Sequence, residues 1–186
     1  MTRQASPDIT TVVLLRHAKS DYPSGVIDHD RPLNPRGRRD APAAGRWLAG
    51  QVNAGAMAVP DLVLCSTATR TLQTWDLARV GAAELGVVLP GATPEHSIYE
   101  ASVESLWALL TWARAQVSNV LLVGHAPAIP DLALALAGPS SDRRAVEAVH
   151  HKYPTSGVAL VELPPRPMTA EPLIPGVLRS FVVPRG

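Results

Sequence analysis

Three short apolar segments, each followed at once by polar residues suited to catalysis, constrain the fold of this chain more than any other feature. The segments cover residues 10–15, 61–65 and 120–123. Each is too short for a helix, and an almost continuous apolar run is typical of a strand buried on both faces of a parallel sheet. The sequence therefore predicts three buried strands.

Segments with helical character separate these strands. Asn34 and Pro35 form a cap and first-turn pair that should open a helix running towards Leu48, with a kink or a late start at Pro42. Gly86 is expected to end a second helix, which starts near Thr69. The remaining predicted elements are helices at 69–85, 103–117 and 127–137 and strands at 157–163 and 177–183. This alternation predicts a layered α/β fold with a largely parallel sheet.

The length of 186 residues lies in the usual range for one domain, and we find no internal repeat or linker. We therefore expect a single domain over residues 1–186. Residues 1–9 are expected to be flexible. Five prolines between Pro164 and Pro175 predict a surface loop over 164–176, because proline cannot donate to a strand ladder.

Composition excludes several classes of function. A net charge of +1 without a concentrated basic stripe does not favour nucleic-acid binding. No apolar run approaches the roughly 20 residues that span a bilayer, so no membrane partner is expected. Cys65 is the single cysteine, and the N-terminus lacks the pattern of a signal peptide. The sequence therefore predicts a soluble protein of the cytoplasm.

The polar groups that follow the three strands could share one pocket. Arg16 and His17 follow the first strand, Ser66 and Arg70 the second, and His125 the third. Because the carboxyl ends of strands in open α/β sheets are where ligands bind, these groups are expected at one edge of the sheet. Guanidinium groups match phosphate oxygens and stay charged. A phosphate site is the natural prediction.

The chain resembles the histidine phosphatase superfamily, which is phosphoglycerate mutase-like, in its small SixA-like phosphohistidine phosphatase branch. Four ordered blocks carry the resemblance: Leu15 to Ser20 (LRHAKS), Asp30 to Gly37 (DRPLNPRG), Cys65 to Thr74 (CSTATRTLQT) and Val123 to His125 (VGH). The first block reads Arg16-His17-Ala18, where most members of the superfamily have glycine in place of the alanine. The resemblance implies a three-layer α/β sandwich with a mostly parallel central sheet.

The resemblance also implies roles for individual residues. His17 would be the nucleophile that takes the phosphoryl group, and Arg16, Arg70 and His125 would bind its oxygens. Positive neighbours should hold the pKa of His17 down. Further substrate contacts would come from Arg31, Ser20 and Glu100. No metal ion or other cofactor is implied.

The implied activity is metal-independent phosphatase activity through a phosphohistidine intermediate, with protein phosphohistidine as the preferred substrate. The segment in which many members carry a catalytic carboxylate is missing, so Glu100 is the only nearby candidate for a general acid. The absence of that segment predicts an open, shallow site suited to a protein-borne phosphate. Two alternatives remain: a phosphatase of a small phosphorylated metabolite, and a binding module for phosphate or phosphoproteins without turnover.

Each candidate residue also has a purely structural interpretation. His17 and His125 could be core histidines, Arg16 and Arg70 ion-pair partners, and Glu100 a residue that starts a helix. A cysteine phosphatase is not expected, because four residues separate Cys65 from Arg70 where that loop needs five, and Cys65 lies in an apolar strand. The remaining histidines, at positions 29, 96, 150 and 151, have no motif around them and are interpreted as surface residues.

Overall fold

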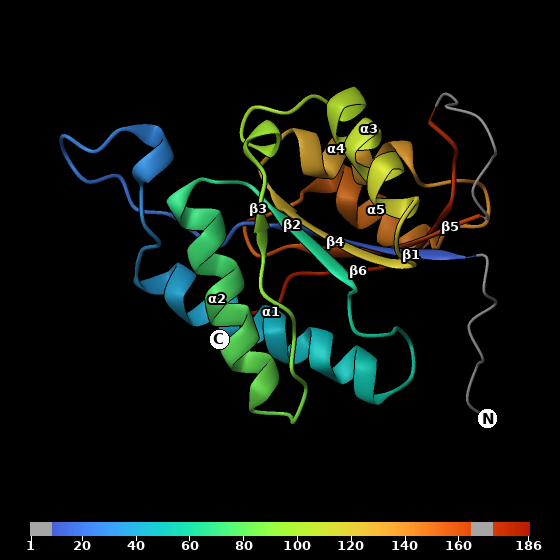
Figure 1. Ribbon diagram of the computed structural model, residues 1–186, viewed down its shortest axis with the longest axis horizontal. Coiled ribbons are helices and arrows are strands. Elements are labelled where there is room, and N and C mark those ends of the chain that lie inside the picture. The colour runs from blue at the N-terminus through green and yellow to red at the C-terminus, as the bar shows by residue number, and fades with distance from the viewer. Residues whose placement is uncertain (1–8, 165–172) are drawn as a thin grey trace.

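The computed structural model describes residues 9–164 and 173–186, and within these ranges a six-stranded sheet forms the centre of the protein (Figure 1). The strand order is β3-β2-β4-β1-β5-β6. The strands are β1 (Thr10–Arg16), β2 (Leu62–Cys65), β3 (Thr93–Pro94), β4 (Asn119–Gly124), β5 (Val158–Leu163) and β6 (Val177–Val182). Strands β3, β2, β4 and β1 pair in parallel, whereas β5 pairs antiparallel to β1 and to β6.

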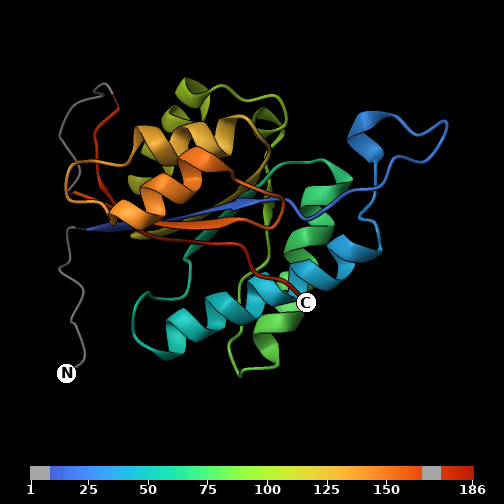
Figure 2. The ribbon, with the colours of Figure 1, turned by 180° about the vertical axis from the view of Figure 1, so that it is seen from behind.

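Helices cover both faces of this sheet, so the predicted three-layer α/β fold is confirmed. Helices α1 (Pro35–Asn53) and α2 (Thr69–Ala83) lie on one face. Helices α3 (Val103–Arg114), α4 (Ala128–Ala135) and α5 (Arg143–His151) lie on the other, as the view from behind also shows (Figure 2). Two short 3-10 turns, η1 (Asp28–Asp30) and η2 (His96–Ile98), lie in the connections.

Strand β1 explains why the first apolar run has no polar face. Val12 and Leu14 belong to the hydrophobic core under α3, α4 and α5. Val13 and Leu15 belong to the core under α1 and α2. Because successive side chains of a strand point to opposite faces, a sheet covered on both sides requires apolar residues at every position.

The parallel register places the ends of the three predicted strands level with one another. Arg16 at the end of β1 pairs with Gly124 at the end of β4. Val123 of β4 pairs in turn with Cys65, the last residue of β2. The residues that follow these strands therefore leave the sheet at one edge.

Some of the predicted elements are confirmed and others differ from the structure. The helix opened by Asn34 is confirmed, and the Asn34 side chain accepts a hydrogen bond from the Gly37 amide. The helix starts at Pro35 rather than late at Pro42, and it runs past Leu48 to Asn53. Strand β3 and helix α5 were not predicted. Of the segments expected to be flexible or looped, residues 1–8 and 165–172 lie outside the described residues. No helix in the described ranges is long and apolar enough to cross a membrane.

The contact between α1 and α2 depends on two glycines, and this gives a first prediction. A Cβ atom at Gly45 would collide with the backbone carbonyl of Ala78, and one at Gly81 with that of Pro42. We expect Gly45→Ala to lower the free energy of unfolding by about 3 kcal/mol, because backbone atoms cannot move aside cheaply. Urea denaturation measures this change.

Gly50 in the same helix is the matched control. It has open space where a Cβ would be, so Gly50→Ala should stabilise the protein by about 0.5–1 kcal/mol through helix propensity. Equal effects of the two substitutions would contradict close helix packing at Gly45.

Candidate active site

The structure brings together the four residues predicted to form the catalytic core. His17 follows β1, His125 follows β4, and Arg70 lies in the first turn of α2. The two imidazole rings have centroids 5.1 Å apart, and Arg70 Nη2 lies 3.3 Å from His125 Nδ1. The charge of Arg16 acts on both rings. The level strand ends account for this convergence.

His17 presents one free ring nitrogen. Its Nδ1 donates a hydrogen bond of 2.7 Å to the carbonyl of Ala18, because a carbonyl oxygen can only accept, so the lone pair of a neutral ring lies on Nε2. The side chain is buried, and burial lowers its pKa to about 3 although the hydrogen bond to the Ala18 carbonyl raises it; His125, Arg70 and Arg16 make smaller contributions that lower it. Positive neighbours do act in the predicted direction, but desolvation is the larger cause.

His125 is also neutral in this arrangement. Arg70 Nη2 has only hydrogens to offer, so His125 Nδ1 accepts and His125 Nε2 donates to Ser66 Oγ at 2.8 Å. Burial, followed by the charge of Arg70, lowers the pKa of His125 to about 3. The positive charge of the site at neutral pH therefore comes from its arginines.

Both core arginines keep hydrogen-bond donors that no group in the described part of the chain uses. Arg16 Nη1 donates to the carbonyl of Tyr153 at 2.6 Å, and Arg70 Nη1 donates to the carbonyl of Asp28 at 2.6 Å. The Nε atoms of both side chains are buried and have no hydrogen-bond partner among the described residues. Buried unpaired donors on cations favour an anion at this place.

Arg31 and Ser20 lie beside this core, in the segment between β1 and α1. Arg31 Nη1 donates to Ser20 Oγ at 3.2 Å, and Arg31 Nη2 forms an ion pair of 2.6 Å with Asp28. Asp28 forms a second ion pair, of 3.0 Å, with Arg70. The two predicted substrate contacts thus connect to the core through Asp28.

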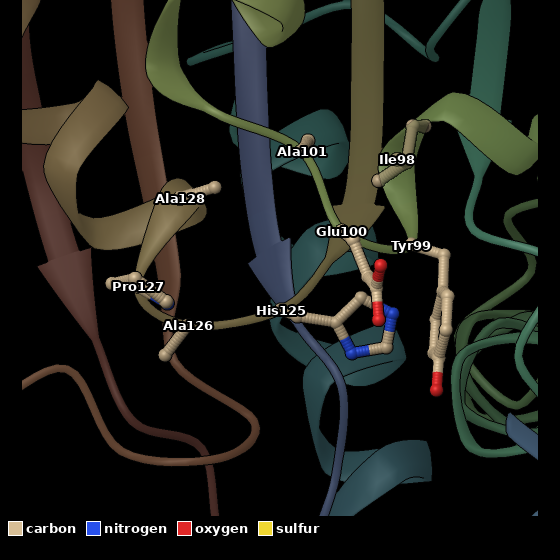
Figure 3. A pocket seen from close by; sticks show the side chains of 8 residues that line it. All are labelled: Ile98, Tyr99, Glu100, Ala101, His125, Ala126, Pro127 and Ala128. Atoms are coloured by element: carbon tan, nitrogen blue, oxygen red, sulfur yellow. The ribbon is translucent and has the colours of Figure 1, made fainter. Parts of the chain in front are cut away.

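Glu100 lines a pocket next to His125. The pocket has a volume of about 280 Å³ and is bounded by the segments 98–101 and 125–128. Figure 3 shows the side chains of Tyr99 and Glu100 extending on the same side as the His125 ring. Glu100 is exposed and precedes Ser102, which caps α3, so it lies at the mouth of the pocket.

Sequence reasoning missed Asp28 and Tyr99. Asp28 Oδ2 accepts a hydrogen bond of 2.7 Å from the Tyr99 hydroxyl, the largest reason that the pKa of Asp28 falls to about 2. A signal for Asp28 was present, since an acidic residue three positions before Arg31 can pair with it. Tyr99 carried no such signal, because the chain folds 71 positions back to bring it to Asp28.

Two other predictions concern chemistry outside this core. Cys65 is buried in β2, as predicted, and burial raises the pKa of its thiol to about 12, which disfavours the reactive thiolate. Within residues 9–164 and 173–186 no group of three or more histidine, cysteine or acidic side chains is placed to hold a metal ion.

Comparisons with known proteins agree with this geometry. A model of the histidine phosphatase superfamily (branch 1) matches residues 12–89. An uncharacterized protein of Mycobacterium tuberculosis is 39% identical over 172 residues, which are 92% of this chain and 100% of that protein. The structure of a putative phosphohistidine phosphatase SixA from Nakamurella multipartitia is 31% identical, with a TM-score of 0.72 over 95% of this chain and 96% of that one.

The fold extends to more distant proteins. A phosphoglycerate mutase from Plasmodium falciparum, 14% identical, superimposes with a TM-score of 0.58 over 96% of this chain and 94% of its own. The predicted phosphoglycerate mutase-like fold is confirmed.

The low pKa of both histidines predicts how stability depends on pH. The unfolded chain has histidines with a pKa near 6.5, so between about pH 6.5 and about pH 3 it binds more protons than the folded protein. Stability should therefore fall as the pH is lowered through this window, by up to about 1.4 kcal/mol per pH unit for each histidine. Urea denaturation in phosphate-free buffer measures the slope.

His17→Gln should make this slope shallower, whereas substitution of the exposed His150 by Gln should not change it. An unchanged slope in His17→Gln would mean that the ring is not held neutral by burial.

Proposed function

The chain belongs to the histidine phosphatase superfamily, and from that premise we propose that it hydrolyses protein phosphohistidine through a phosphohistidine intermediate on His17, without a metal ion. The observation that carries the proposal is the state of His17. Its Nδ1 proton is fixed by the Ala18 carbonyl, its Nε2 lone pair is free, and its ring is buried and neutral beside two arginines. A neutral, oriented imidazole is what an attack on phosphorus requires.

In the first step, His17 Nε2 attacks the phosphorus and the bond to the leaving group breaks. Arg16 and Arg70 bind the phosphoryl oxygens, with their unpaired Nε donors among the groups available. Their charge offsets the negative charge of the transferring group, which is the main requirement of phosphoryl transfer. His125 lies against both His17 and Arg70, where it can contact the same oxygens.

In the second step, water attacks the phosphorus of phospho-His17. The Ala18 carbonyl keeps the proton on Nδ1 throughout. His17 therefore leaves as a neutral imidazole rather than as an imidazolate anion, which would be a far poorer leaving group. The same hydrogen bond that orients the nucleophile thus helps to break the intermediate.

Phosphohistidine is the preferred substrate for two reasons. A substrate imidazole that keeps a proton on its distal nitrogen needs no general acid to leave. This suits a core that offers no acid, because both histidines are neutral and Asp28, with a pKa of about 2, is ionised. The rim beside Arg70 is also accessible, because the Asp28 side chain is 56% exposed. The similarity to a putative phosphohistidine phosphatase SixA supports the same class.

Trapping the intermediate tests this proposal. Wild type and His17→Ala are incubated with labelled phosphohistidine peptide or labelled acetyl phosphate, quenched with base, and counted for acid-labile label. We expect label on wild type alone and loss of turnover of at least about 1000-fold in His17→Ala, because the variant has no nucleophile at this place. The faster donor identifies the substrate class.

The outcomes separate the alternatives. Consumption of substrate by wild type without any label would point to direct attack by water. If neither protein consumes either donor and both bind phosphate equally, the chain is a binding module and the proposal fails.

Hydrolysis of a small phosphorylated metabolite by the same mechanism is the second candidate, and the pocket next to His125 favours it. Glu100 is the carboxyl group that lines this pocket. If Glu100 protonates an alcohol leaving group, Glu100→Gln should slow hydrolysis of an alkyl phosphate about 100-fold and leave phosphohistidine turnover unchanged. Equal rates of Glu100→Gln and wild type on both substrates would remove the argument for this candidate.

A further inference from the structure

Tyr99 lies against the core of the site, although nothing in the sequence marks it. Its ring meets His125 edge to face, with centroids 5.6 Å apart and an interplanar angle of 85°. The guanidinium carbon of Arg70 lies 5.7 Å from the centre of the same ring. Tyr99 also lines the pocket next to His125 (Figure 3). A phosphoryl group held by Arg70 and His125 would therefore have Tyr99 as a neighbour.

The hydroxyl group of Tyr99 has a fixed direction. It donates its proton to Asp28 Oδ2 at 2.7 Å, and Asp28 is held in turn by its ion pairs with Arg31 and Arg70. A carboxylate can only accept at neutral pH, so the phenolic proton is committed to it. The remaining lone pairs of the Tyr99 oxygen can then only accept hydrogen bonds.

Tyr99 belongs to the outer side of the site. His17 is only 8% exposed, whereas the Asp28 side chain is 56% exposed and Tyr99 is half-buried. His17 thus lies deeper than the layer formed by Asp28 and Tyr99. In an in-line transfer the leaving group lies opposite the nucleophile, which places it in this outer layer.

Other aromatic rings continue the layer outwards. The ring centroid of His29 lies 4.9 Å from that of Tyr99, and the ring of His96 is stacked on Tyr99 at 6.3 Å. Thr67 Oγ1 joins them, at 3.0 Å from His29 Nε2 and 3.1 Å from His96 Nδ1. Flat rings around the Tyr99 hydroxyl oxygen suit a flat leaving group that carries one N–H.

We propose that the Tyr99 hydroxyl oxygen accepts a hydrogen bond from the substrate's phosphorylated imidazole, at the ring nitrogen that does not carry the phosphoryl group. This inference rests on the proposed function and assigns it a specificity residue. Tyr99 would do for the substrate ring what the Ala18 carbonyl does for His17, which is to keep a proton on the distal nitrogen.

The bonds and charges of the step balance. The lone pair of His17 Nε2 forms the new P–N bond, and the electron pair of the old P–N bond returns to the substrate nitrogen. The proton on the distal nitrogen stays in place, so the substrate ring leaves as neutral imidazole.

The titratable or charged groups that face Tyr99, and that could also respond to pH, are Asp28, Arg70, His29, His96, Glu100 and His125.

Tyr99→Phe tests the proposal, because it keeps the ring and removes only the hydroxyl. The probes are phosphoimidazole and acetyl phosphate, whose leaving acetate has no N–H to donate. We expect kcat/KM for phosphoimidazole to fall about tenfold at about pH 8 and less at about pH 6, because an imidazole ring loses its proton in this range unless a partner holds it. Acetyl phosphate turnover should stay within about twofold of wild type, which also establishes that the variant is folded.

Tyr22→Phe is the matched control. Tyr22 is an exposed tyrosine that lies over Arg31 in the segment between β1 and α1. Removal of its hydroxyl should leave kcat/KM unchanged for both probes. Equal losses of Tyr99→Phe on both probes, no loss on either, or a loss on phosphoimidazole that does not grow with pH would each overturn the role of Tyr99. If wild type fails to take label from phosphoimidazole at all, the proposed function fails instead.

Discussion

The parallel register of β1, β4 and β2 is the constraint on which the rest of the structure depends. The pairings of Arg16 with Gly124 and of Cys65 with Val123 bring three strand ends to one level. A slip of one residue in β1 would exchange its two buried faces and turn His17 away from His125. Since β1 is apolar on both faces, hydrophobicity alone would tolerate such a slip, and the close packing of specific side chains in both cores is what resists it. Packing far from the site thereby fixes the distance between its two histidines.

Backbone contacts then hold the segment between β1 and α1 against that edge. The Asn34 amide donates to the Lys19 carbonyl, and Gly37 lies so close to the Lys19 backbone that a Cβ atom would not fit. The Leu33 amide donates to the side chain of Gln73 in α2. With both ends of the segment tied, the short η1 turn presents Asp28 to Arg70 without a large loss of chain entropy on binding. Fixed supports of this kind are what an oriented site requires.

The sequence predicted most of what the strands and their ends determine, and little of what the loops determine. Apolar runs and caps predicted the strands and the start of α1, and the residues after the strands predicted His17, Arg70 and His125 as neighbours. Helix α1 does not start late at Pro42 and extends past Leu48 to Asn53, because its packing against α2 at Gly45 and Gly81 favours helix on both sides of the proline. Tyr99 could not be predicted, since its partner Asp28 is distant in sequence and no local pattern encodes their contact.

Low polarity around the site acts on its charges in two ways. Burial disfavours a charged imidazole, so His17 and His125 stay neutral, while Arg16 and Arg70 keep their charge because guanidinium holds its proton so strongly. The same surroundings strengthen the attraction between those arginines and a phosphoryl dianion. A bound dianion would in turn favour proton uptake by His125, which lies beside Arg70 and is not the residue that attacks phosphorus. The site can thus gain positive charge at His125 when the substrate arrives. Burial keeps the nucleophile neutral, and it outweighs the hydrogen bond to the Ala18 carbonyl, which raises the pKa of His17.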